Sequence, residues 1–444
     1  MKLIEHLIPV AVSDEKTLLI NALNGLMDLV NNSVYDTILS WTKLGSCSPE
    51  TEEEQALFQA LHSRGYLVNN QAEEDARREE VVALLRNQHE AWKDDRKYVV
   101  FIMTYDCNFR CPYCFEGDEC LKKGVISPEQ IDSALKLVEN TVEHICLFGG
   151  EPLLPETRSA LEYLISKAPD KLYSMYTNGY YLLEFYDILS TVQIEKIVVT
   201  LDGEEQAHNS RRFLADGSPT FEKILLGIEK FLENGIAIHI RVNVDKENVE
   251  SSTRLKNTMY ERFAAFADSL FFEIAPIMGT TSAYKTDLLA EIYRSDLDYS
   301  LEERLKRSSL VEGSSLTAAF SGNLKQLRPM YCFCNAHIST VAFDPYGQMY
   351  SCLVSVGKEN MSVGTYYPEM KFKKDSLYNR NIETIPQCRK CVYALLCGGG
   401  CSMALSRSEN LYQPVCSKTR SNIHDLLPRL FQLEQDKAAS MQNN

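Results

Sequence analysis

The stretch TYDCNFRCPYCFEGD, residues 104–118, carries three cysteines, Cys107, Cys111 and Cys114, in the spacing C-x3-C-x2-C. Cysteine thiolates hold iron–sulfur clusters, and a [4Fe–4S] cube has four irons to ligate. Three cysteines would ligate three irons and leave the fourth open to a substrate or cofactor, much as a catalytic zinc site keeps one position open. A zinc knuckle and three free thiols are the alternatives that this spacing leaves.

A second set of cysteines is concentrated in the C-terminal quarter of the chain. Its segment QCRKCVYALLCGGGC has the spacing C-x2-C-x5-C-x3-C, and a further cysteine follows it by fifteen residues. Zinc is the alternative for a lone C-x2-C pair, but seven cysteines in interleaved order favour iron–sulfur ligation. The seven are Cys334, Cys352, Cys388, Cys391, Cys397, Cys401 and Cys416, and Cys332 lies close to the first of them.

The composition describes an ordinary globular protein of 444 residues with a formal net charge of −15. This charge disfavours a nucleic-acid partner, which would call for a basic surface. No run approaches the roughly 18 apolar residues of a membrane span, and the N-terminus lacks a signal peptide, so we expect a cytoplasmic protein with no membrane partner. The 14 cysteines are then not mainly disulfides, because the cytosol keeps thiols reduced. Cys47 and Cys146 are expected to be buried apolar residues, and Cys120 has no assigned role.

Residues 97–277 alternate between apolar runs and segments of helical spacing, which predicts a parallel sheet. Six strands are expected, so the fold is either a doubly wound open sheet or a partial (β/α)6 TIM-like barrel. Their sequences are KYVVFIMTY, EHICLFGG, LYSMYTNG, EKIVVTLDG, IAIHIRVNV and SLFFEIAPI. A helix is expected to begin after Ser127, with Pro128 at its first position and Gln130 completing a capping box.

Polar or glycine residues follow five successive predicted strands. The cysteine motif follows the first, Gly149-Gly150-Glu151 the second, Thr177-Asn178-Gly179 the third and Asp202-Gly203 the fourth, and Asn243 ends the fifth. Active sites of barrel folds collect at the carboxyl ends of the strands. This pattern favours the partial barrel.

Three further regions flank the sheet region. Residues 1–90 are expected to form a small α+β domain: a hairpin, a third strand, two helices and a charged linker helix. Residues 278–330 are polar and irregular and are expected to connect the sheet to the C-terminal region. Residues 331–444 hold the second cysteine set and a closing helix, SNIHDLLPRLFQLEQD.

The segment from Asp106 to Cys114, with Tyr113 before its last cysteine, resembles the signature of radical S-adenosylmethionine (SAM) enzymes. The resemblance covers about 97–277 and includes FGGEP after the second strand. It implies that Cys107, Cys111 and Cys114 bind a [4Fe–4S] cluster whose open iron is chelated by SAM. It also implies SAM contacts by Tyr113 near the adenine, by Gly149, Gly150 and Glu151 at the methionine amine, by Thr177 and Asn178, and by Arg211 at the carboxylate. Each of these residues has a structural alternative: a tight turn for the glycines, a helix cap for Glu151, a surface ion pair for Arg211.

The resemblance also implies the reaction. An electron from the reduced cluster cleaves SAM to methionine and a 5′-deoxyadenosyl radical, which removes a hydrogen atom from the substrate. The protein supplies position and excludes water. A small electron donor such as flavodoxin or ferredoxin is expected.

The second cysteine set resembles the SPASM domain of radical SAM enzymes that mature peptides and proteins. That resemblance implies two auxiliary [4Fe–4S] clusters, hence three clusters in all. Cys334, Cys352 and Cys401 would hold the first, and Cys388, Cys391, Cys397 and Cys416 the second. Cys332 either completes the first auxiliary cluster or is a spare thiol that leaves one iron open.

The order of elements in residues 1–90 resembles the leader-peptide recognition domain of ribosomal-peptide maturases, related to the pyrroloquinoline-quinone chaperone. In that family the leader adds as a strand to the edge of the sheet. A winged-helix DNA-binding domain shares these elements, but residues 1–90 hold 7 Lys+Arg and 15 Asp+Glu, a net of −8, which is poor for phosphate contacts. A purely structural lobe is a further alternative.

These patterns predict a partial (β/α)6 barrel with an N-terminal winged-helix-like domain and a C-terminal SPASM domain. The expected function is that of an oxidoreductase that forms a cross-link in a ribosomally made precursor peptide, with a thioether favoured and a carbon–carbon bond also compatible. The alternatives are a maturase of an active-site residue in a folded protein, similar to anaerobic sulfatase-maturing enzymes, and an electron-transfer protein without SAM chemistry. No catalytic base is evident; Asp344 is a candidate, although DPYG also predicts a turn there.

Overall fold

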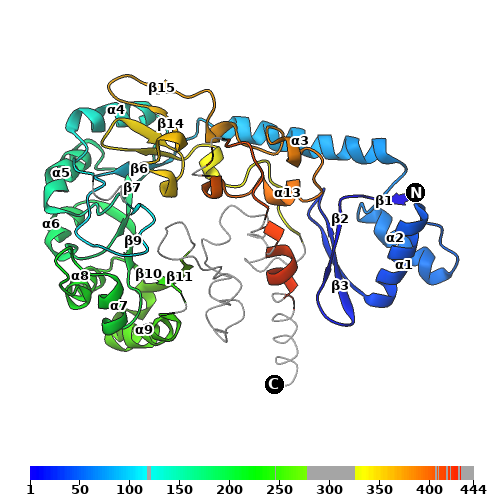
Figure 1. Cartoon of the computed structure of the whole chain (residues 1–444), viewed down its shortest axis with the longest axis horizontal. Helices are drawn as coiled ribbons and strands as arrows, with labels where there is room; N and C mark the ends of the chain where they lie inside the picture. The colour runs from blue at the N-terminus through cyan, green and yellow to red at the C-terminus, as the bar shows by residue number, and fades with distance from the viewer. Residues whose placement is uncertain are drawn as a thin grey trace. The chain divides into compact units, whose positions relative to one another are not determined.

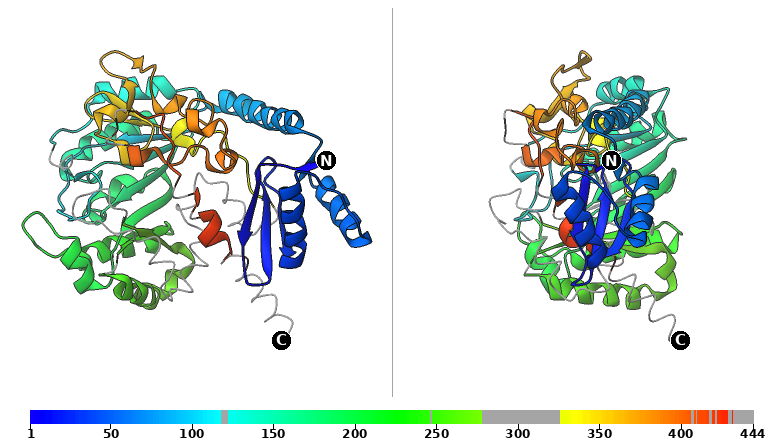
Figure 2. Two further views of the ribbon diagram at one scale, coloured as in Figure 1. Left: turned by 45° about the vertical axis from the view of Figure 1, so that its right-hand side comes forward. Right: turned by 90° about the vertical axis from the view of Figure 1, so that its right-hand side faces the viewer.

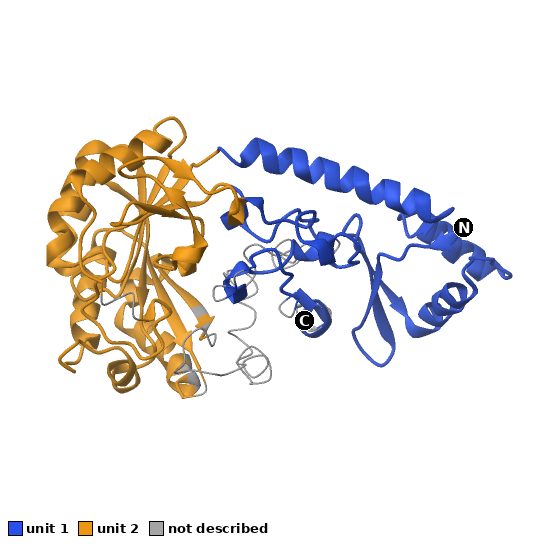
Figure 3. Ribbon diagram, turned by 45° about the horizontal axis from the view of Figure 1, so that its top comes forward, with its two compact units in different colours: residues 1–94, 311–338, 379–444 blue, residues 95–310, 339–378 orange. Residues whose placement is uncertain are grey.

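The computed structural model describes residues 1–117, 122–245, 247–277, 326–405, 408, 410–416, 419–420, 422–428 and 431. The chain forms two compact units (Figure 3). The first unit consists of residues 1–94, 311–338 and 379–444, and the second of residues 95–310 and 339–378. Most of the predicted connecting segment, residues 278–325, and Cys120 lie outside the described residues.

The second unit contains the six predicted parallel strands. They are β6 (Tyr98–Ile102), β7 (His144–Phe148), β8 (Leu172–Thr177), β9 (Gln193–Thr200), β10 (Ile238–Val244) and β11 (Leu270–Pro276). They lie side by side in chain order from β6 to β11. A doubly wound sheet would reverse its strand order partway across, and this sheet does not. All carboxyl ends of parallel strands meet at one edge, so the residues that follow the strands are brought together there.

Helices connect these strands, and Figure 1 shows α4, α5, α6 and α8 along one face of the sheet. Ser127 and Gln130 form the predicted capping box at the start of α4, and Pro128 is its first residue. Phe221, Ile224, Ile228 and Phe231 of α8 are buried, as the spacing of an amphipathic helix requires. The helices are α4 (Pro128–Val138), α5 (Arg158–Lys167), α6 (Tyr186–Leu189), α7 (Glu205–Arg211), α8 (Phe221–Glu233) and α9 (Val249–Arg262).

The sheet continues beyond β6 with four strands from the C-terminal region. β12 (Val341–Phe343) pairs in parallel with β6, with Val341 opposite Val99. β13 (Gln348–Tyr350), β14 (Ser362–Thr365) and β15 (Lys371–Phe372) follow as an antiparallel series. Residues 339–378 therefore belong with the sheet, whereas the sequence pattern placed them in a separate region that began at 331.

The N-terminal part of the first unit has the predicted hairpin, third strand and helices. β2 (Leu7–Ala11), β3 (Lys16–Asn21) and β4 (Met27–Asn31) form an antiparallel sheet in that order. α1 (Asn32–Leu44), α2 (Glu52–Ser63) and α3 (Gln71–Trp92) follow, and Figure 2 shows α1 beside the hairpin. A short pair that was not predicted, β1 (Lys2–Leu3) with β5 (Leu67–Val68), holds the two ends of this part together.

One hydrophobic core joins this N-terminal part to the cysteine-bearing segment of the same unit. Trp41, Tyr66 and Val82 share the core with Ile385 and Leu395. Helix α3 adds polar links to the same segment: Arg86 pairs with Glu383 at 2.7 Å, and the Nε2 atom of His89 lies 2.8 Å from the carbonyl oxygen of His337. Residues 1–90 are thus packed together with residues that follow 379, rather than forming a core of their own.

The closing segment contains the helix α13 (Ala394–Cys397) and a π-helical turn at Asn422–Leu426. The turn falls inside the predicted closing helix, most of whose later residues are not described. Within the described ranges, no helix has both the length and the apolar composition needed to cross a membrane.

Candidate active site

The three cysteines of the first motif lie in the loop after β6, and all three side chains are partly exposed. The loop is held by its own hydrogen bonds: the N–H of Cys107 donates to the Asp106 carboxylate at 2.9 Å, and the N–H of Cys114 donates to the carbonyl of Cys111 at 3.1 Å. The Cys107 sulfur accepts from the N–H of Phe109 at 3.4 Å and from the Asn178 amide at 3.9 Å. N–H donors to sulfur are one of the means by which proteins tune iron–sulfur clusters.

The charges around Cys107 suit a cationic occupant. Burial raises the pKa of the Cys107 thiol well above its usual value, and the nearby Glu151, Cys111 and Cys114 raise it further. Thiolates crowded with a carboxylate need a positive group to stay deprotonated, and an iron centre supplies that charge. The donor set therefore fits a thiolate-bound metal cluster.

No group of three or more His, Cys, Asp or Glu side chains in the described ranges is spaced to share a single metal ion. A tetrahedral zinc ion holds its sulfurs about 2.3 Å from the metal, and hence close to one another. In a cube, each thiolate binds a different iron. The absence of such a group among the described residues therefore bears on sites for a single ion and not on a cube.

Gly149 and Gly150 allow the cysteine loop to approach the end of β7. A Cβ atom at Gly149, whose φ is 141°, would lie 2.2 Å from the carbonyl oxygen of Thr104, and one at Gly150 would lie 2.2 Å from that of Tyr105. The N–H of Gly150 also donates to the Thr104 carbonyl at 3.0 Å. Close backbone packing is thus sufficient to explain both glycines, and their contact with SAM stays a prediction.

Glu151, Thr177 and Asn178 form one hydrogen-bonded group at the ends of β7 and β8. The Glu151 carboxylate accepts from the Thr177 hydroxyl at 2.6 Å, from the Asn178 N–H at 2.6 Å and from the Leu153 N–H at 3.0 Å. Glu151 is only 1% exposed. Burial raises the pKa of Glu151 to about 7, although these hydrogen bonds favour the ionised form. The structure therefore brings together three residues that the sequence pattern predicted to act together.

Tyr113 is buried beside Asp202 and Arg212, two residues to which the sequence pattern assigned no role. Its hydroxyl is within hydrogen-bonding distance of the Asp202 carboxylate, and Arg212 donates to the same hydroxyl at 2.9 Å. Burial raises the pKa of Tyr113 well above its usual value, so the phenol stays neutral and donates to Asp202. This network connects the cysteine loop to the end of β9.

The two adjacent arginines after β9 have different surroundings. Arg211 is paired with Asp245 through two hydrogen bonds of 3.1 and 2.8 Å, and its Nε atom lies 3.5 Å from the Asp202 carboxylate. The guanidinium of Arg212 is buried, lies 5.6 Å from the centre of the Phe109 ring, and has no hydrogen-bond partner for Nε among the described residues. Burial alone would lower the pKa of Arg212, but nearby ionisable groups, Cys111 first among them, raise it well above its usual value.

Arg211 was the predicted carboxylate ligand, but its charge is already neutralised by Asp245. Arg212 faces the cysteine loop and, unlike Arg211, has no carboxylate within ion-pair distance among the described residues. The geometry therefore favours Arg212 over Arg211 as the group that would receive an anionic ligand. The only sequence signal for Arg212 was its place directly after Arg211.

Asp344, the candidate base, is fixed in the turn between β12 and β13. One carboxylate oxygen accepts from the N–H groups of Tyr346 and Gln348 at 2.9 and 2.7 Å, and the other accepts from the Tyr105 hydroxyl at 2.9 Å. These contacts match the turn interpretation of DPYG. They leave a role as base without structural support.

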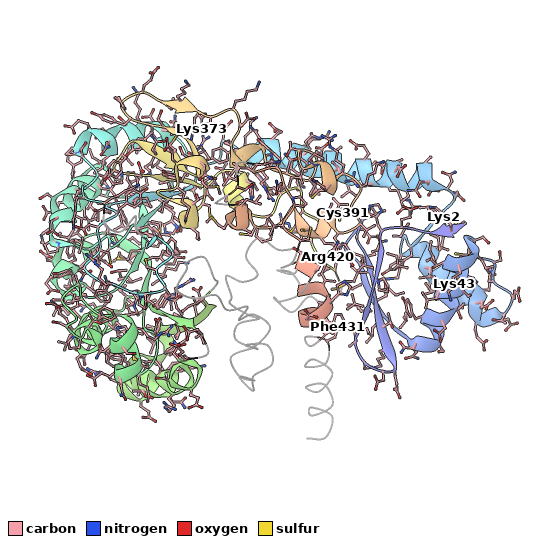
Figure 4. The ribbon with its side chains drawn as sticks, in the orientation of Figure 1. Lys2, Lys43, Lys373, Cys391, Arg420 and Phe431 are labelled. Atoms are coloured by element: carbon pink, nitrogen blue, oxygen red, sulfur yellow. The ribbon has the colours of Figure 1, made fainter. Side chains whose placement is uncertain are left out.

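The first unit brings together the four cysteines that were predicted to hold the second auxiliary cluster. Burial raises the pKa of Cys388 to about 12, and the neighbouring Cys397, Cys391 and Cys416 raise it as well. Cys388 and Cys391 lie in successive turns, with the N–H of Cys391 donating to the Cys388 carbonyl at 3.2 Å, and Cys397 ends α13. Figure 4 labels Cys391, which lies three residues before α13. These mutually repelling thiolates again fit a cationic metal centre.

The set predicted for the first auxiliary cluster is divided between the units. Cys334 and Cys401 belong to the first unit, as does the buried Cys332, whereas Cys352 belongs to the second. Burial raises the pKa of Cys332 to about 12. Their joint ligation stays a prediction. Cys47 and Cys146 are buried, as predicted.

Residues 101–255 match the family model of the radical SAM superfamily, so this part of the second unit is a radical SAM domain. Two curated relatives overlap it. The GTP 3′,8-cyclase of Clostridium perfringens (strain SM101 / Type A) is 27% identical over 272 residues, which are 58% of this chain and 80% of that protein. The cysteine-type anaerobic sulfatase-maturating enzyme of Clostridium novyi is 23% identical over 327 residues, which are 67% of this chain and 85% of that protein.

A solved structure resembles nearly the whole chain. Streptococcus suis SuiB bound to its precursor peptide SuiA has a TM-score of 0.57 and 16% identity, and the match covers 94% of this chain and 99% of SuiB. SuiB bound to S-adenosylmethionine matches with a TM-score of 0.53, over 95% of this chain and all of SuiB (100%). At this level of identity, the likeness shows a shared fold.

Proposed function

We propose that the protein is a radical SAM maturase that forms a cross-link within a ribosomally made precursor peptide, with a thioether favoured and a carbon–carbon bond as the other form. The observation that carries this proposal is the fold likeness to SuiB, which extends over 94% of the chain and includes the N-terminal part. The two curated relatives match only 58% and 67% of the chain. A peptide substrate therefore has more support than a nucleotide substrate.

Cys107, Cys111 and Cys114 would hold a [4Fe–4S] cluster, and SAM would occupy its open position. When bound, this pair supplies a 5′-deoxyadenosyl radical that abstracts a hydrogen atom from the peptide. Glu151, already oriented by Thr177 and Asn178, would accept hydrogen bonds from the amino group of SAM, because a buried carboxylate is a strong acceptor. Arg212 would receive the carboxylate group through its free donor.

The residues around Tyr113 would exclude water and fix the ligand. Tyr113, Asp202 and Arg212 are each at most 8% exposed and hydrogen-bonded in series. A rigid, water-excluding wall protects a reactive species from quenching. Cys388, Cys391, Cys397 and Cys416 would hold an auxiliary cluster that accepts an electron during cross-linking, with a flavodoxin- or ferredoxin-like protein as the external donor.

We also propose that the leader peptide adds as a strand to the outer edge of β4. Hydrogen-bonded pairs alternate along an antiparallel ladder, and the N–H of Asn21 donates to the Leu26 carbonyl at 2.9 Å. Leu19 and Asp28 are the next such pair, so the main-chain N–H and C=O of Leu29 point away from β3. Strand addition takes its affinity from such main-chain groups.

The opposite edge is less suited to strand addition. Directly before β2, the His6 carbonyl accepts from the N–H of Ala22, which follows β3. Hydrogen-bonded pairs alternate from this point, so the outward positions of β2 are Leu7, Pro9 and Ala11. Pro9 has no N–H, and the edge therefore lacks its central donor. At the β4 edge, the chain's own Gln326 forms a bridge to Leu26, next to the outward position Met27. Leu29 is the outward position beyond that bridge.

The test is to incubate the anaerobically reconstituted enzyme with SAM, a reductant and a short cysteine-containing peptide encoded beside its gene. Cross-linking removes two hydrogen atoms from the peptide, one to the deoxyadenosyl radical and one as a proton with its electron passing to an acceptor. We expect 5′-deoxyadenosine and a peptide lighter by two hydrogens. Loss of one alkylatable thiol would identify the thioether; an unchanged thiol count would identify the carbon–carbon bond. Cleavage of SAM with no change in any such peptide would contradict the proposal.

A second candidate is maturation of an active-site residue in a folded protein, because the match to the sulfatase-maturating relative covers 67% of the chain. The same mass measurement with a sulfatase-derived peptide separates the two candidates. Failure to cleave SAM at full iron content would instead favour an electron-transfer protein.

A further inference from the structure

Arg380 is the largest fully buried side chain of the described residues, with an exposed fraction of 0%. Its guanidinium donates four hydrogen bonds to main-chain carbonyls: Nη2 to Gly399 and Gln413 at 2.7 and 2.8 Å, Nη1 to Gly400 at 2.7 Å, and Nε to Leu411 at 2.8 Å. Arginine keeps its charge in proteins under all ordinary conditions. The first unit therefore contains a permanent cation that is fully buried.

Within the part of the chain that the structure describes, this cation has no carboxylate partner. Among the described residues, no Asp or Glu oxygen lies within ion-pair distance of Arg380, although other arginines, such as Arg86 and Arg211, have such partners. A buried charge without a counter-charge is strongly unfavourable. The ionisable groups close enough to act on the charge of Arg380 are the thiols of Cys388, Cys401, Cys397 and Cys334, which become negative when they are deprotonated.

Three consecutive glycines bring the cysteine-bearing segments around this cation. Gly398, Gly399 and Gly400 all have positive φ, at 58°, 87° and 76°. A Cβ atom on Gly398 would lie 2.4 Å from the backbone of Cys332, and one on Gly400 would lie 1.8 Å from the carbonyl oxygen of Val415, the neighbour of Cys416. One on Gly399 would lie 3.4 Å from the Arg380 guanidinium. The run thus links Cys397 to Cys401 and presents two of its carbonyls to Arg380.

We propose that Arg380 is the internal counter-charge of the auxiliary iron–sulfur ligands of the first unit, which include Cys388 and Cys397 of one predicted set and Cys334 and Cys401 of the other. This inference rests on the proposed function, in which these cysteines hold a cluster. A thiolate-ligated cluster is anionic and becomes more negative when an external donor reduces it by one electron. The guanidinium stabilises that reduced form and thereby raises the reduction potential of the cluster, since net charge is one of the determinants of that potential.

The test uses the full-length protein with Cys107, Cys111 and Cys114 replaced by alanine, so that the remaining iron belongs to auxiliary sites. In this parent, Arg380→Met removes the charge, and Arg380→Lys keeps the charge but removes the planar fork. Arg389→Met is the matched control, because it removes an exposed arginine next to Cys388. Iron per chain and the midpoint of an EPR-monitored reductive titration are measured for each protein.

We expect Arg380→Met to shift the midpoint to a more negative potential, while Arg380→Lys and Arg389→Met remain close to the parent. Loss of iron in Arg380→Met that Arg380→Lys restores supports the same role, because Lys returns the positive charge without the planar fork. An unchanged midpoint in Arg380→Met with full iron overturns the inference. Equal loss of iron in both Arg380 variants also overturns it, since the hydrogen-bonding fork rather than the charge would then matter. A parent without iron refutes the auxiliary cluster itself, and is thereby distinguished from failure of the Arg380 role.

Discussion

The Thr177 hydroxyl donates a hydrogen bond of 2.6 Å to the Glu151 carboxylate, and so joins the ends of two neighbouring strands, β7 and β8. The next N–H along, that of Asn178, donates to the other carboxylate oxygen at the same distance. Both oxygens are thus oriented before any ligand binds. A preoriented acid requires little rearrangement when it receives a cation, which favours binding.

The pKa of Glu151 predicts how SAM binding depends on pH. Burial raises this pKa to about 7, and only the ionised carboxylate is an acceptor at both oxygens for the N–H groups of the SAM amine. We therefore expect affinity for SAM to increase as the pH rises through about 7 and then to level off. Equilibrium dialysis of SAM with the reconstituted enzyme across this range measures it. Affinity that is constant through this range would contradict the proposed role of Glu151.

Glu151→Gln removes the charge but keeps the shape. We expect SAM affinity to fall by about 10- to 100-fold, as for loss of a charged hydrogen bond, and to lose its pH dependence near 7. Glu156→Gln, at an exposed position five residues away, is the matched control and should bind SAM like the wild type.

The same pKa predicts a stability difference in the opposite direction. An unfolded glutamate has a pKa of about 4.3, so between that pH and about 7 the folded protein holds a proton that the unfolded chain has lost. The stability of the ligand-free protein attributable to Glu151 therefore falls as the pH rises through this window. Denaturant melts should show wild type losing stability relative to Glu151→Gln over this interval. A difference that grows in favour of wild type would contradict the assignment.

Arg211 and Arg212 are predicted to differ in what their loss affects. Arg211→Met leaves the buried Asp245 without its partner, and breaking a buried pair in this way costs about 3–5 kcal/mol. We expect a clear drop in the free energy of unfolding of this variant. Arg212→Met should instead weaken SAM binding by about 10- to 100-fold. Denaturant melts and SAM-binding measurements on both variants test this. Weaker SAM binding by an Arg211→Met variant of full stability would instead identify Arg211 as the ligand of the SAM carboxylate.

Much of the candidate site could be predicted from the sequence because parallel strands impose a simple rule. Glu151 and Asn178 follow strands and Thr177 ends one, and the strands lie in chain order, so these residues meet at one edge. The choice between Arg211 and Arg212 could not be made this way. Arg211 is the last residue of α7, whereas Arg212 has left the helix with φ −130° and ψ 86°. Which of the two meets Asp245 therefore depends on where α7 ends and how it packs.

The division of the C-terminal region could not be predicted for a different reason. β12 is only three residues long, and it joins the sheet through pairing with β6, some 240 residues earlier in the chain. Such non-local pairing leaves no local pattern in the sequence. The buried role of Arg380 was hidden likewise, since its partners are the main-chain carbonyls of Gly399, Gly400, Leu411 and Gln413, which lie 19 to 33 residues ahead.

The proposed leader site predicts that the two edges of the N-terminal sheet differ. Leu29→Pro removes an outward N–H from β4, and loss of one main-chain hydrogen bond should weaken leader binding by about 3- to 10-fold. Ala11→Pro removes an outward N–H from β2 and is the matched control, expected to bind the leader like the wild type. Fluorescence anisotropy with a labelled leader measures both, and thermal melts verify folding. Equal weakening by the two substitutions, or weakening by Ala11→Pro alone, would refute the β4 edge.

Iron content tests the cysteine assignments directly. Three cubane clusters require about 12 irons per chain, and replacing Cys107, Cys111 and Cys114 by alanine should leave about 8, because each cube contains four irons. Cys146→Ala is the matched control: this thiol is buried in β7, and its loss should leave the iron content unchanged. Acid-labile sulfide should fall in parallel with iron in the triple variant. A wild-type value of about 4 irons would retain the radical SAM site but contradict both auxiliary clusters, and bound zinc with little iron would contradict the cluster assignments as a whole.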